Sequence, residues 1–299
     1  MTNVLTVISD PRGPGIDDNT IGGARAALAG LGADPDDATD WLAPGVACDL
    51  GFARGDRAAI QTAVRARLAD ARVDVVAQPR AGRRKKLLVA DMESTIIANE
   101  MVDELAAVAG VGAKVAAITD RVVRGELEFA AALAERVAML AGLPADTLDR
   151  LCARIVVMPG ARALVQTMRA HGATTALVSG GFTCFSGRVR RALGFDSDYA
   201  NRLEIEDSRL TGRVRRPILD RAGKRARLVA LATKLGLTET ETMAVGDGAN
   251  DLAMLAAAGM GVAFRAKPVV AESARARIDH GDLTALLYIQ GYRARDIRE

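Results

Sequence analysis

Two apolar segments that each end on acidic residues constrain the fold of this chain most strongly. The first, Leu87-Leu-Val-Ala, leads into Asp91 and is followed by Met-Glu-Ser-Thr. The second, Met243-Ala-Val-Gly, leads into Asp247 and is followed by Gly-Ala-Asn-Asp. Short apolar runs of this kind are typical of buried parallel strands. Open α/β sheets bind ligands beyond the carboxyl ends of such strands. The pattern therefore predicts one crevice that receives carboxylates from two strands.

The segments around these strands predict a doubly wound sheet. Helical and strand-like stretches alternate, at 162–170, 174–178, 185–193, 224–235 and 243–245, with a polar hairpin at about 199–215. Such alternation favours a parallel sheet with helices on both faces. Residues from about 99 to 158 show helical spacing without a strand-like run. We interpret that block as a helical cap, inserted after the first strand and placed to cover the crevice.

The first 80 residues have a different order of elements. They read as β-α-β-β-α-β, which is the order of a ferredoxin-like α+β domain. A basic run ends this region, and we interpret residues 81–86 as a solvated linker because like charges resist burial. A chain of 299 residues suits two such domains. We therefore expect a ferredoxin-like domain at 1–80 and an α/β domain at 87–299.

Composition excludes several classes of protein. The net charge of +3 is too small to indicate a nucleic-acid or membrane partner. We find no apolar stretch of about 18 residues and no signal-peptide pattern at the start, so we expect a cytoplasmic protein. The three cysteines lack C-x-x-C spacing, which indicates neither a disulfide framework nor a zinc site.

The acidic residues at the strand ends suggest phosphoryl chemistry. Asp91 is the candidate nucleophile, because a carboxylate can attack a phosphoryl group and form an acyl-phosphate. Glu93 could then protonate the leaving oxygen and later activate water. Ser94 and Thr95 offer hydroxyl groups to a phosphate at a helix start. Taken alone, Asp91 could equally cap the following helix.

Further candidates surround this pair. Asp247 can bind Mg²⁺ directly, with Asp251 and Asn250 orienting the site, although a plain polar turn is the alternative. Ser179 and Gly180 follow a strand and could hold phosphate oxygens, or form an ordinary glycine-rich turn. The remaining candidates are charges on helices: Lys224, which we place at a helix start where the dipole disfavours a cation, and Glu100 and Arg136, which could simply be exposed charges of the cap.

Together these motifs resemble the haloacid dehalogenase-like superfamily of aspartate-nucleophile phosphatases. The resemblance covers about residues 85 to 295 and rests on several motifs in order: Asp91-Met-Glu-Ser-Thr-Ile-Ile-Ala-Asn-Glu100, Leu127-Glu-Phe, Arg136-Val-Ala-Met-Leu, Val178-Ser-Gly-Gly-Phe182, Ala200-Asn-Arg-Leu, Lys224 and Ala244-Val-Gly-Asp-Gly-Ala-Asn-Asp251.

The resemblance implies a magnesium-dependent phosphatase acting on phosphoserine in serine biosynthesis. It assigns a nucleophile (Asp91), a general acid and base (Glu93), magnesium ligands (Asp91, the Glu93 carbonyl and Asp247, supported by Asp251) and phosphate ligands (Ser179, Gly180, Lys224 and Asn250). Glu100 and Arg136 would meet the ammonium and carboxylate of the substrate. The superfamily usually has aspartate where this chain has Glu93, which keeps the carboxyl group but changes its reach.

Three alternatives stay open at this stage. The chain could hydrolyse another small phosphomonoester or transfer phosphate to a different amino-alcohol. It could instead be a catalytically weak, serine-sensing homologue, which the unusual Glu93 would favour.

The N-terminal unit resembles the small ligand-binding, ACT-like domains attached to some family members, so a homodimer formed through it is a further expectation.

Overall fold

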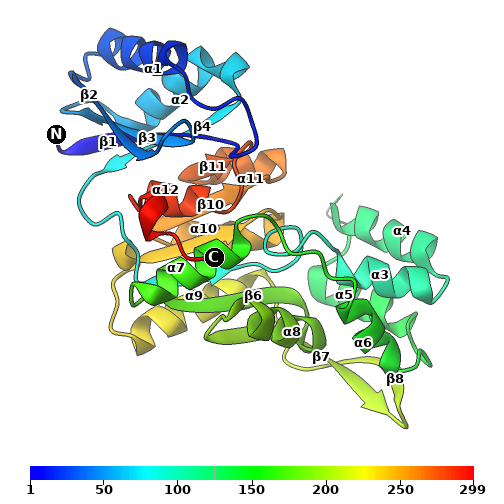
Figure 1. Ribbon diagram of the computed structural model, residues 1–299. Helices are drawn as coiled ribbons and strands as arrows, with labels where there is room; N and C mark the ends of the chain where they lie inside the picture. Colours follow the sequence, from blue (N-terminus) through cyan, green and yellow to red (C-terminus); the bar gives the residue numbers. More distant parts are fainter. Residues whose placement is uncertain (124–125) are drawn as a thin grey trace.

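The computed structural model describes residues 1–123 and 126–299, which form two sheets with their helices and a helical cap (Figure 1). The N-terminal sheet has the strand order β2-β3-β1-β4, with each neighbouring pair antiparallel. Its elements are β1 (Asn3–Ser9), α1 (Asp18–Gly30), β2 (Pro35–Ala43), β3 (Ala47–Phe52), α2 (Arg57–Arg67) and β4 (Val73–Pro79). This order confirms the predicted ferredoxin-like fold.

Both faces of the two central strands of the N-terminal sheet, β1 and β3, are buried. Leu5 and Val7 pack with Leu28 and Ile60 of the two helices on one face. Ile8 and other residues of the opposite face belong to the large hydrophobic cluster of the main domain. Helix α12 (Ala285–Ile289) lies on that side and contacts β1 and β3. The N-terminal sheet is therefore packed between its own helices and the main domain.

The main sheet has seven strands in the order β11-β10-β9-β5-β6-β7-β8. The strands are β5 (Leu87–Ala90), β6 (Thr174–Phe182), β7 (Ser197–Glu206), β8 (Arg209–Arg215), β9 (Thr242–Gly246), β10 (Met260–Phe264) and β11 (Ala276–Ile278). Strand β8 pairs antiparallel with β7, and the other neighbouring pairs are parallel. The predicted doubly wound α/β sheet is confirmed.

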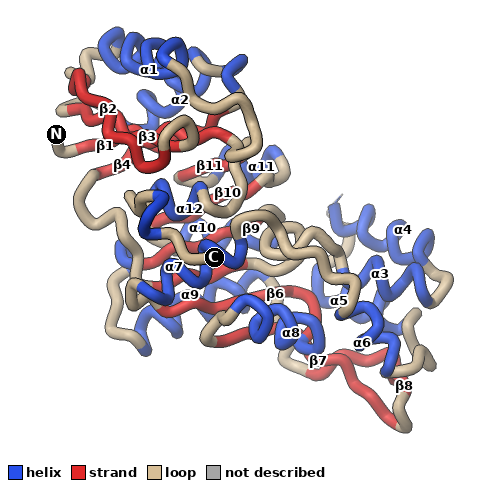
Figure 2. The backbone as a smooth tube through the Cα atoms, in the orientation of Figure 1, coloured by secondary structure: helices blue, strands red, loops and turns tan. Residues whose placement is uncertain are grey.

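Alternate residues of the central strand face opposite hydrophobic layers. Leu88 and Ala90 pack in the cluster that includes α7 (Ala161–Ala170), α8 (Thr183–Leu193) and α12. Leu87 and Val89 pack in the other cluster, with α9 (Arg221–Lys234), α10 (Leu252–Ala257) and α11 (Pro268–Ser273). Burial on both faces explains why β5 is apolar throughout and does not alternate between apolar and polar residues. Figure 2 shows the strands running between the two helical layers.

In its described residues, 99–123 and 126–158, the cap contains four helices, which lie at the side of the main sheet (Figure 1). They are α3 (Met101–Val108), α4 (Gly112–Val123), α5 (Phe129–Ala138) and α6 (Asp146–Cys152). The β7–β8 hairpin is attached to these helices, because Gly142 and Leu143, in the loop between α5 and α6, exchange backbone hydrogen bonds with Leu210 of β8. Within residues 1–123 and 126–299, no helix combines the length and apolar character needed to span a bilayer.

Candidate active site

The carboxyl ends of three adjacent strands bring the predicted residues together. Ala90 of β5 lies in register with Leu177 of β6 on one side and Val245 of β9 on the other. Asp91 follows Ala90 directly, Ser179 lies two residues beyond Leu177, and Asp247 lies two residues beyond Val245. The polar groups of three neighbouring strands therefore meet at this edge of the sheet, as the sequence pattern predicted.

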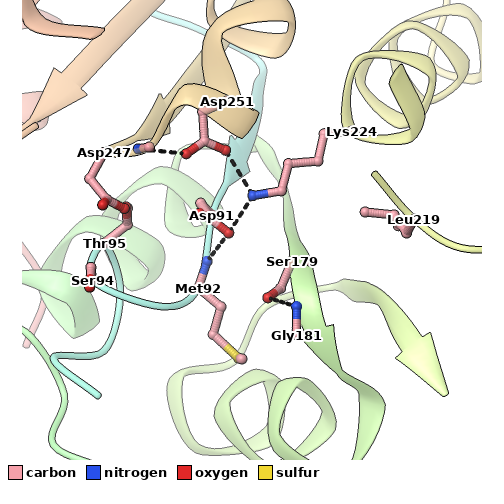
Figure 3. A network of polar contacts seen from close by, with 12 residues as sticks. Asp91, Met92, Ser94, Thr95, Ser179, Gly181, Leu219, Lys224, Asp247 and Asp251 are labelled. Atoms are coloured by element: carbon pink, nitrogen blue, oxygen red, sulfur yellow. Dashed lines mark hydrogen bonds and ion pairs between the residues drawn. The ribbon is translucent and has the colours of Figure 1, made fainter. Parts of the chain in front are cut away.

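A buried ion cluster occupies the centre of this edge (Figure 3). The Nζ of Lys224 lies 2.7 Å from Oδ1 of Asp91 and 2.8 Å from Oδ1 of Asp251. Lys224 is 1% exposed, Asp91 is 5% exposed and Asp251 is fully buried. The second oxygen of Asp251 accepts the backbone N–H of Gly248 at 3.1 Å. Lysine thus bridges the two carboxylates where water cannot screen them.

The position of Lys224 corrects one sequence-based expectation. Helix α9 begins at Arg221 rather than at Lys224, because Asp220 caps it by accepting the N–H of Gly223. Lys224 is therefore the fourth residue of the helix and points inward to the strand ends. Its charge is stabilised by the two carboxylates and does not face the helix dipole alone. Burial disfavours its ammonium, but Asp251 and Asp91 outweigh that effect and raise the pKa of Lys224.

The carboxylates of this cluster outnumber its cation. Oxygens of Asp91, Asp247 and Asp251 lie within 4.8 Å of one another. Burial, followed by repulsion from Asp251, raises the pKa of Asp91 despite the nearby Lys224. Burial likewise raises the pKa of Asp247 to about 6. Buried carboxylate oxygens with excess negative charge are the donor set that a hard divalent cation prefers. These residues fit magnesium.

The side chains next to this cluster are held by specific hydrogen bonds. The hydroxyl of Thr95 donates to Oδ1 of Asp247 at 2.9 Å, which orients that carboxylate. Ser179 lies on the other side of Asp91 (Figure 3), and its hydroxyl oxygen accepts the N–H of Gly181 at 2.9 Å. Asn250 lies in the short helical turn Ala249–Asp251 and is half-buried. Thr95 was expected to offer its hydroxyl to phosphate, whereas here it supports Asp247.

Glu93 connects this edge with the cap. Its Oε1 accepts the backbone N–H of Met101, the first residue of α3, at 2.9 Å. Its carboxylate also lies against Gly181, where an added Cβ would come within 2.8 Å of Oε2. Burial, followed by repulsion from Glu100, raises the pKa of Glu93 from 4.5 to about 7. A carboxyl group with this pKa can both donate and accept a proton near neutral pH.

The two predicted charges of the cap are placed around Glu93. Glu100 is the N-cap residue of α3, not a residue within a helix as expected, and its carboxylate accepts the hydroxyl of Ser94 at 2.6 Å. Arg136 is half-buried near the end of α5. Burial lowers the pKa of Arg136, while Asp103, Glu93 and Glu100 act in the opposite sense. Glu100 and Arg136 therefore both lie close enough to Glu93 to influence its pKa, in opposite directions.

The cap also covers the expected phosphate cradle. The ring of Phe129, the first residue of α5, lies close to Gly180, where an added Cβ would come within 3.1 Å of it. Glycine at this position leaves room for the ring. The cap thus contacts this edge of the sheet at Gly180 through α5 and at Glu93 through α3.

Asn201 was not predicted to be a functional residue, although its Ala-Asn-Arg-Leu motif was noted. It is 2% exposed. Its Nδ2 donates to the carbonyl of Gly180 at 2.8 Å and to that of Leu219 at 3.2 Å, and its Oδ1 accepts the N–H of Leu219 at 2.7 Å. The side chain fixes the Gly180 peptide and the loop that leads into α9. The Ala200-Asn-Arg-Leu motif was the available sequence signal.

The chain is similar to known phosphatases in sequence. The family model described as haloacid dehalogenase-like hydrolase matches residues 88–256. The phosphoserine phosphatase of Archaeoglobus fulgidus is 43% identical over 241 residues, which are 80% of this chain and 69% of the relative. That of Mycobacterium tuberculosis is 42% identical over 255 residues, 85% of this chain and 62% of the relative. The chain thus spans about two thirds of these relatives' length.

A solved structure resembles the chain over nearly its whole length. A haloacid dehalogenase family hydrolase from Salmonella enterica superposes with a TM-score of 0.86 at 30% sequence identity, covering 96% of this chain and 98% of that one. The resemblance inferred from the sequence motifs is confirmed by these similarities.

Proposed function

This chain belongs to the haloacid dehalogenase-like hydrolase family, and we propose that it hydrolyses O-phospho-L-serine to L-serine and phosphate with the help of magnesium. It is an enzyme of the phosphoserine phosphatase type. The observation that carries the proposal is the buried cluster in which Lys224 bridges Asp91 and Asp251, with Glu93, at a raised pKa, beside it.

Asp91 is the nucleophile in the proposed mechanism. A carboxylate oxygen of Asp91 attacks the phosphorus, the bond from phosphorus to the serine oxygen breaks, and Glu93 gives its proton to that oxygen. An aspartyl-phosphate remains. Glu93, now ionised, takes a proton from water as the water oxygen attacks the phosphorus. Phosphate leaves, and both carboxyl groups return to their starting states.

Magnesium would be held by Asp91, the Glu93 carbonyl and Asp247, with Asp251 in support. When bound, the ion neutralises phosphate oxygens so that an anionic nucleophile can approach them. Lys224, which contacts Asp91, would add a second positive charge beside the phosphate. Ser179, Gly180 and Asn250 complete the set of proposed phosphate ligands. The hydroxyl of Thr95 keeps the Asp247 carboxylate in one orientation.

Selection of the amino-acid part of the substrate is assigned to the cap. We propose that Glu100 meets the ammonium group and Arg136 the carboxylate of phosphoserine. Both side chains act on the pKa of Glu93, which supports their placement around the reacting oxygen. The contact between Phe129 and Gly180 supports a cap that excludes water while the acyl-phosphate forms.

A phosphate-release assay tests this function. Phosphoserine, phosphothreonine and small sugar phosphates are compared, each with and without magnesium. We expect phosphoserine to be turned over fastest and removal of magnesium to abolish turnover. A preference for a sugar phosphate would leave the chemistry but overturn the substrate. No release from any of these compounds would favour a serine-sensing protein instead.

The wider biological role follows from the proposed reaction. Release of L-serine from phosphoserine would make this chain the last enzyme of serine biosynthesis, acting in the cytoplasm. The domain boundaries at residues 80 and 87 and a homodimer formed through the N-terminal domain stay predictions. Analytical ultracentrifugation of the full chain measures the oligomeric state directly.

A further inference from the structure

A groove of about 1070 Å³ lies between the N-terminal sheet and the main sheet. One wall comes from α2 and the linker, and the other comes from η2 (Glu239–Glu241), α11 and β11. None of the ten proposed catalytic, metal and substrate residues lines it. The groove is therefore separate from the candidate active site.

Helix α2 presents one polar face to this groove. Arg57, Gln61 and Arg65 are spaced four residues apart, which places them on the same side of the helix. The first and the last of them are about 12 Å apart along the helix axis. Gln61 holds the helix over the groove, because its Oε1 accepts the N–H of Ala77 at 3.1 Å and its Nε2 donates to the carbonyl of Arg275 at 3.4 Å.

Cations outnumber acids in the lining. The basic residues are Arg57, Arg65, Arg83, Arg84, Lys85, Lys86, Arg275 and Arg277, and the acidic residues are Asp56, Glu241 and Glu272. Several of the cations have acidic partners, such as Lys86 with Glu241 at 2.7 Å. In the part of the chain that the structure describes, Arg57, Arg65 and Lys85 form no ion pair.

Two of these unpaired cations are shielded from water: Arg65 is half-buried, and Lys85 is buried although the linker that contains it was expected to be solvated. Lys85 is 8% exposed, and its Nζ donates to the carbonyls of Gly82 at 3.0 Å and Thr240 at 2.7 Å. An ammonium group has three donors, so one is left for a further acceptor. Burial, followed by repulsion from Arg275, lowers the pKa of Lys85.

Arg65 is the clearest example of a cation in this groove that lacks a partner. Its Nη2 is buried and has no hydrogen-bond partner among the described residues. Burial and the neighbouring Arg277 lower its pKa, whereas Asp279 and Asp74 oppose this. Both acids are already engaged: Asp74 accepts the N–H of Asp279 at 2.7 Å, and the carboxylate of Asp279 pairs with Arg277. A buried guanidinium nitrogen without an acceptor costs free energy until an acceptor arrives.

We propose that this groove binds a small polyanion, a molecule carrying two or more phosphate or carboxylate groups. Guanidinium groups form charge-assisted, often bidentate hydrogen bonds with both kinds of anion. The arginines of α2 face Arg275 and Arg277 across the groove. A bound polyanion screens their mutual repulsion and joins the N-terminal domain to the main domain.

Titration calorimetry of the full chain tests the proposal. Inorganic pyrophosphate and citrate are the two probes, in metal-free buffer that contains no phosphate, and they distinguish phosphate from carboxylate as the preferred group. We expect Arg65→Met to weaken binding of the preferred anion about tenfold or more. Arg67→Met is the matched control, because Arg67 lies on the same helix but does not line the groove. It should change the affinity less than about twofold.

Thermal unfolding of the same proteins separates binding from folding. Without anion, Arg65→Met should melt no lower than the unmodified chain, because it removes a half-buried charge that has no ion-pair partner among the described residues. The anion should raise the melting temperature of the unmodified chain and of Arg67→Met by similar amounts, and that of Arg65→Met clearly less. The proposal is overturned if neither probe binds the unmodified chain, or if both variants lose affinity equally. Neither measurement depends on catalysis.

Discussion

The carboxylate of Glu93 accepts a hydrogen bond from the backbone N–H of Met101 at 2.9 Å. This contact joins the proposed general acid to the first residue of the cap. The same carboxylate fills the space above the Cα of Gly181. The additional methylene of glutamate relative to aspartate therefore has a visible use, because it extends the carboxylate to the cap helix.

The fit between Glu93 and Gly181 predicts a specific interaction between two substitutions. In Gly181→Ala, the added Cβ would lie 2.8 Å from Oε2 of Glu93, so we expect catalytic turnover to fall about tenfold or more as the carboxylate is displaced. A shorter side chain in Glu93→Asp should make room for it. The double variant should therefore lose less turnover than the sum of the two single effects, on a logarithmic scale. Strict additivity of the two effects in steady-state kinetics would contradict the packing.

The raised pKa of Glu93 predicts how stability depends on pH. The folded chain keeps the proton up to about pH 7, whereas the unfolded chain loses it near 4.5. The folded state binds more protons across this window, so the unfolding free energy falls as pH rises through it. Glu93→Gln cannot ionise and escapes that loss.

The difference between Glu93→Gln and the unmodified chain should thus grow in favour of the variant, by on the order of 3 kcal/mol between pH 4.5 and 8. Urea unfolding of the metal-free proteins measures it. Glu128→Gln is the control, because Glu128 is exposed. A difference that stays constant with pH would show that Glu93 titrates normally.

The sequence was sufficient to predict the strand ends but not the contacts made there. Asp91 and Asp247 each end an apolar run, and adjacent parallel strands necessarily bring such ends together. The partners of Lys224 come from residues 91 and 251, far apart in the chain, so its inward direction could not be read from local spacing. The contact of Glu93 with Met101 depends on where α3 begins, and helix starts are uncertain by a few residues in any sequence-based prediction.

Replacing the proposed nucleophile should abolish turnover without unfolding the protein. Asp91→Asn keeps the shape of the side chain but removes its nucleophilic oxygen, so we expect kcat for phosphoserine to fall by at least about 10³-fold. Burial and Asp251 already disfavour the ionised form of Asp91. A neutral side chain should therefore leave the melting temperature unchanged or higher. Undiminished phosphate release by the variant would exclude the proposed aspartyl-phosphate.

Loss of Arg136 should reduce activity on one kind of substrate. Arg136→Met removes the group proposed to hold the substrate carboxylate, so kcat/KM for phosphoserine should fall about 10²-fold. An aryl phosphate without a carboxylate should be hydrolysed within about threefold of the normal rate. Arg150→Met is the control, because Arg150 is an exposed cap residue that pairs with Asp146. Equal losses on both substrates would remove Arg136 from the specificity site.

Asn201 should support catalysis without touching the substrate. Asn201→Ala leaves the N–H of Leu219 and the carbonyl of Gly180 without their buried partner. We expect the free energy of unfolding to fall by about 2–4 kcal/mol and kcat to fall about tenfold, because the Gly180 peptide and the loop before α9 lose their fixed positions.

The control for Asn201 is another amide that binds backbone away from the site. Gln166 donates to the carbonyl of Leu193 at 2.5 Å, so Gln166→Ala should also lower stability. Turnover of both variants is measured well below their melting temperatures, where each remains folded. A positioning role requires kcat to fall in Asn201→Ala and to stay normal in Gln166→Ala. If the two variants keep the same kcat, Asn201 contributes to folding alone and the Gly180 peptide is held by the strand itself.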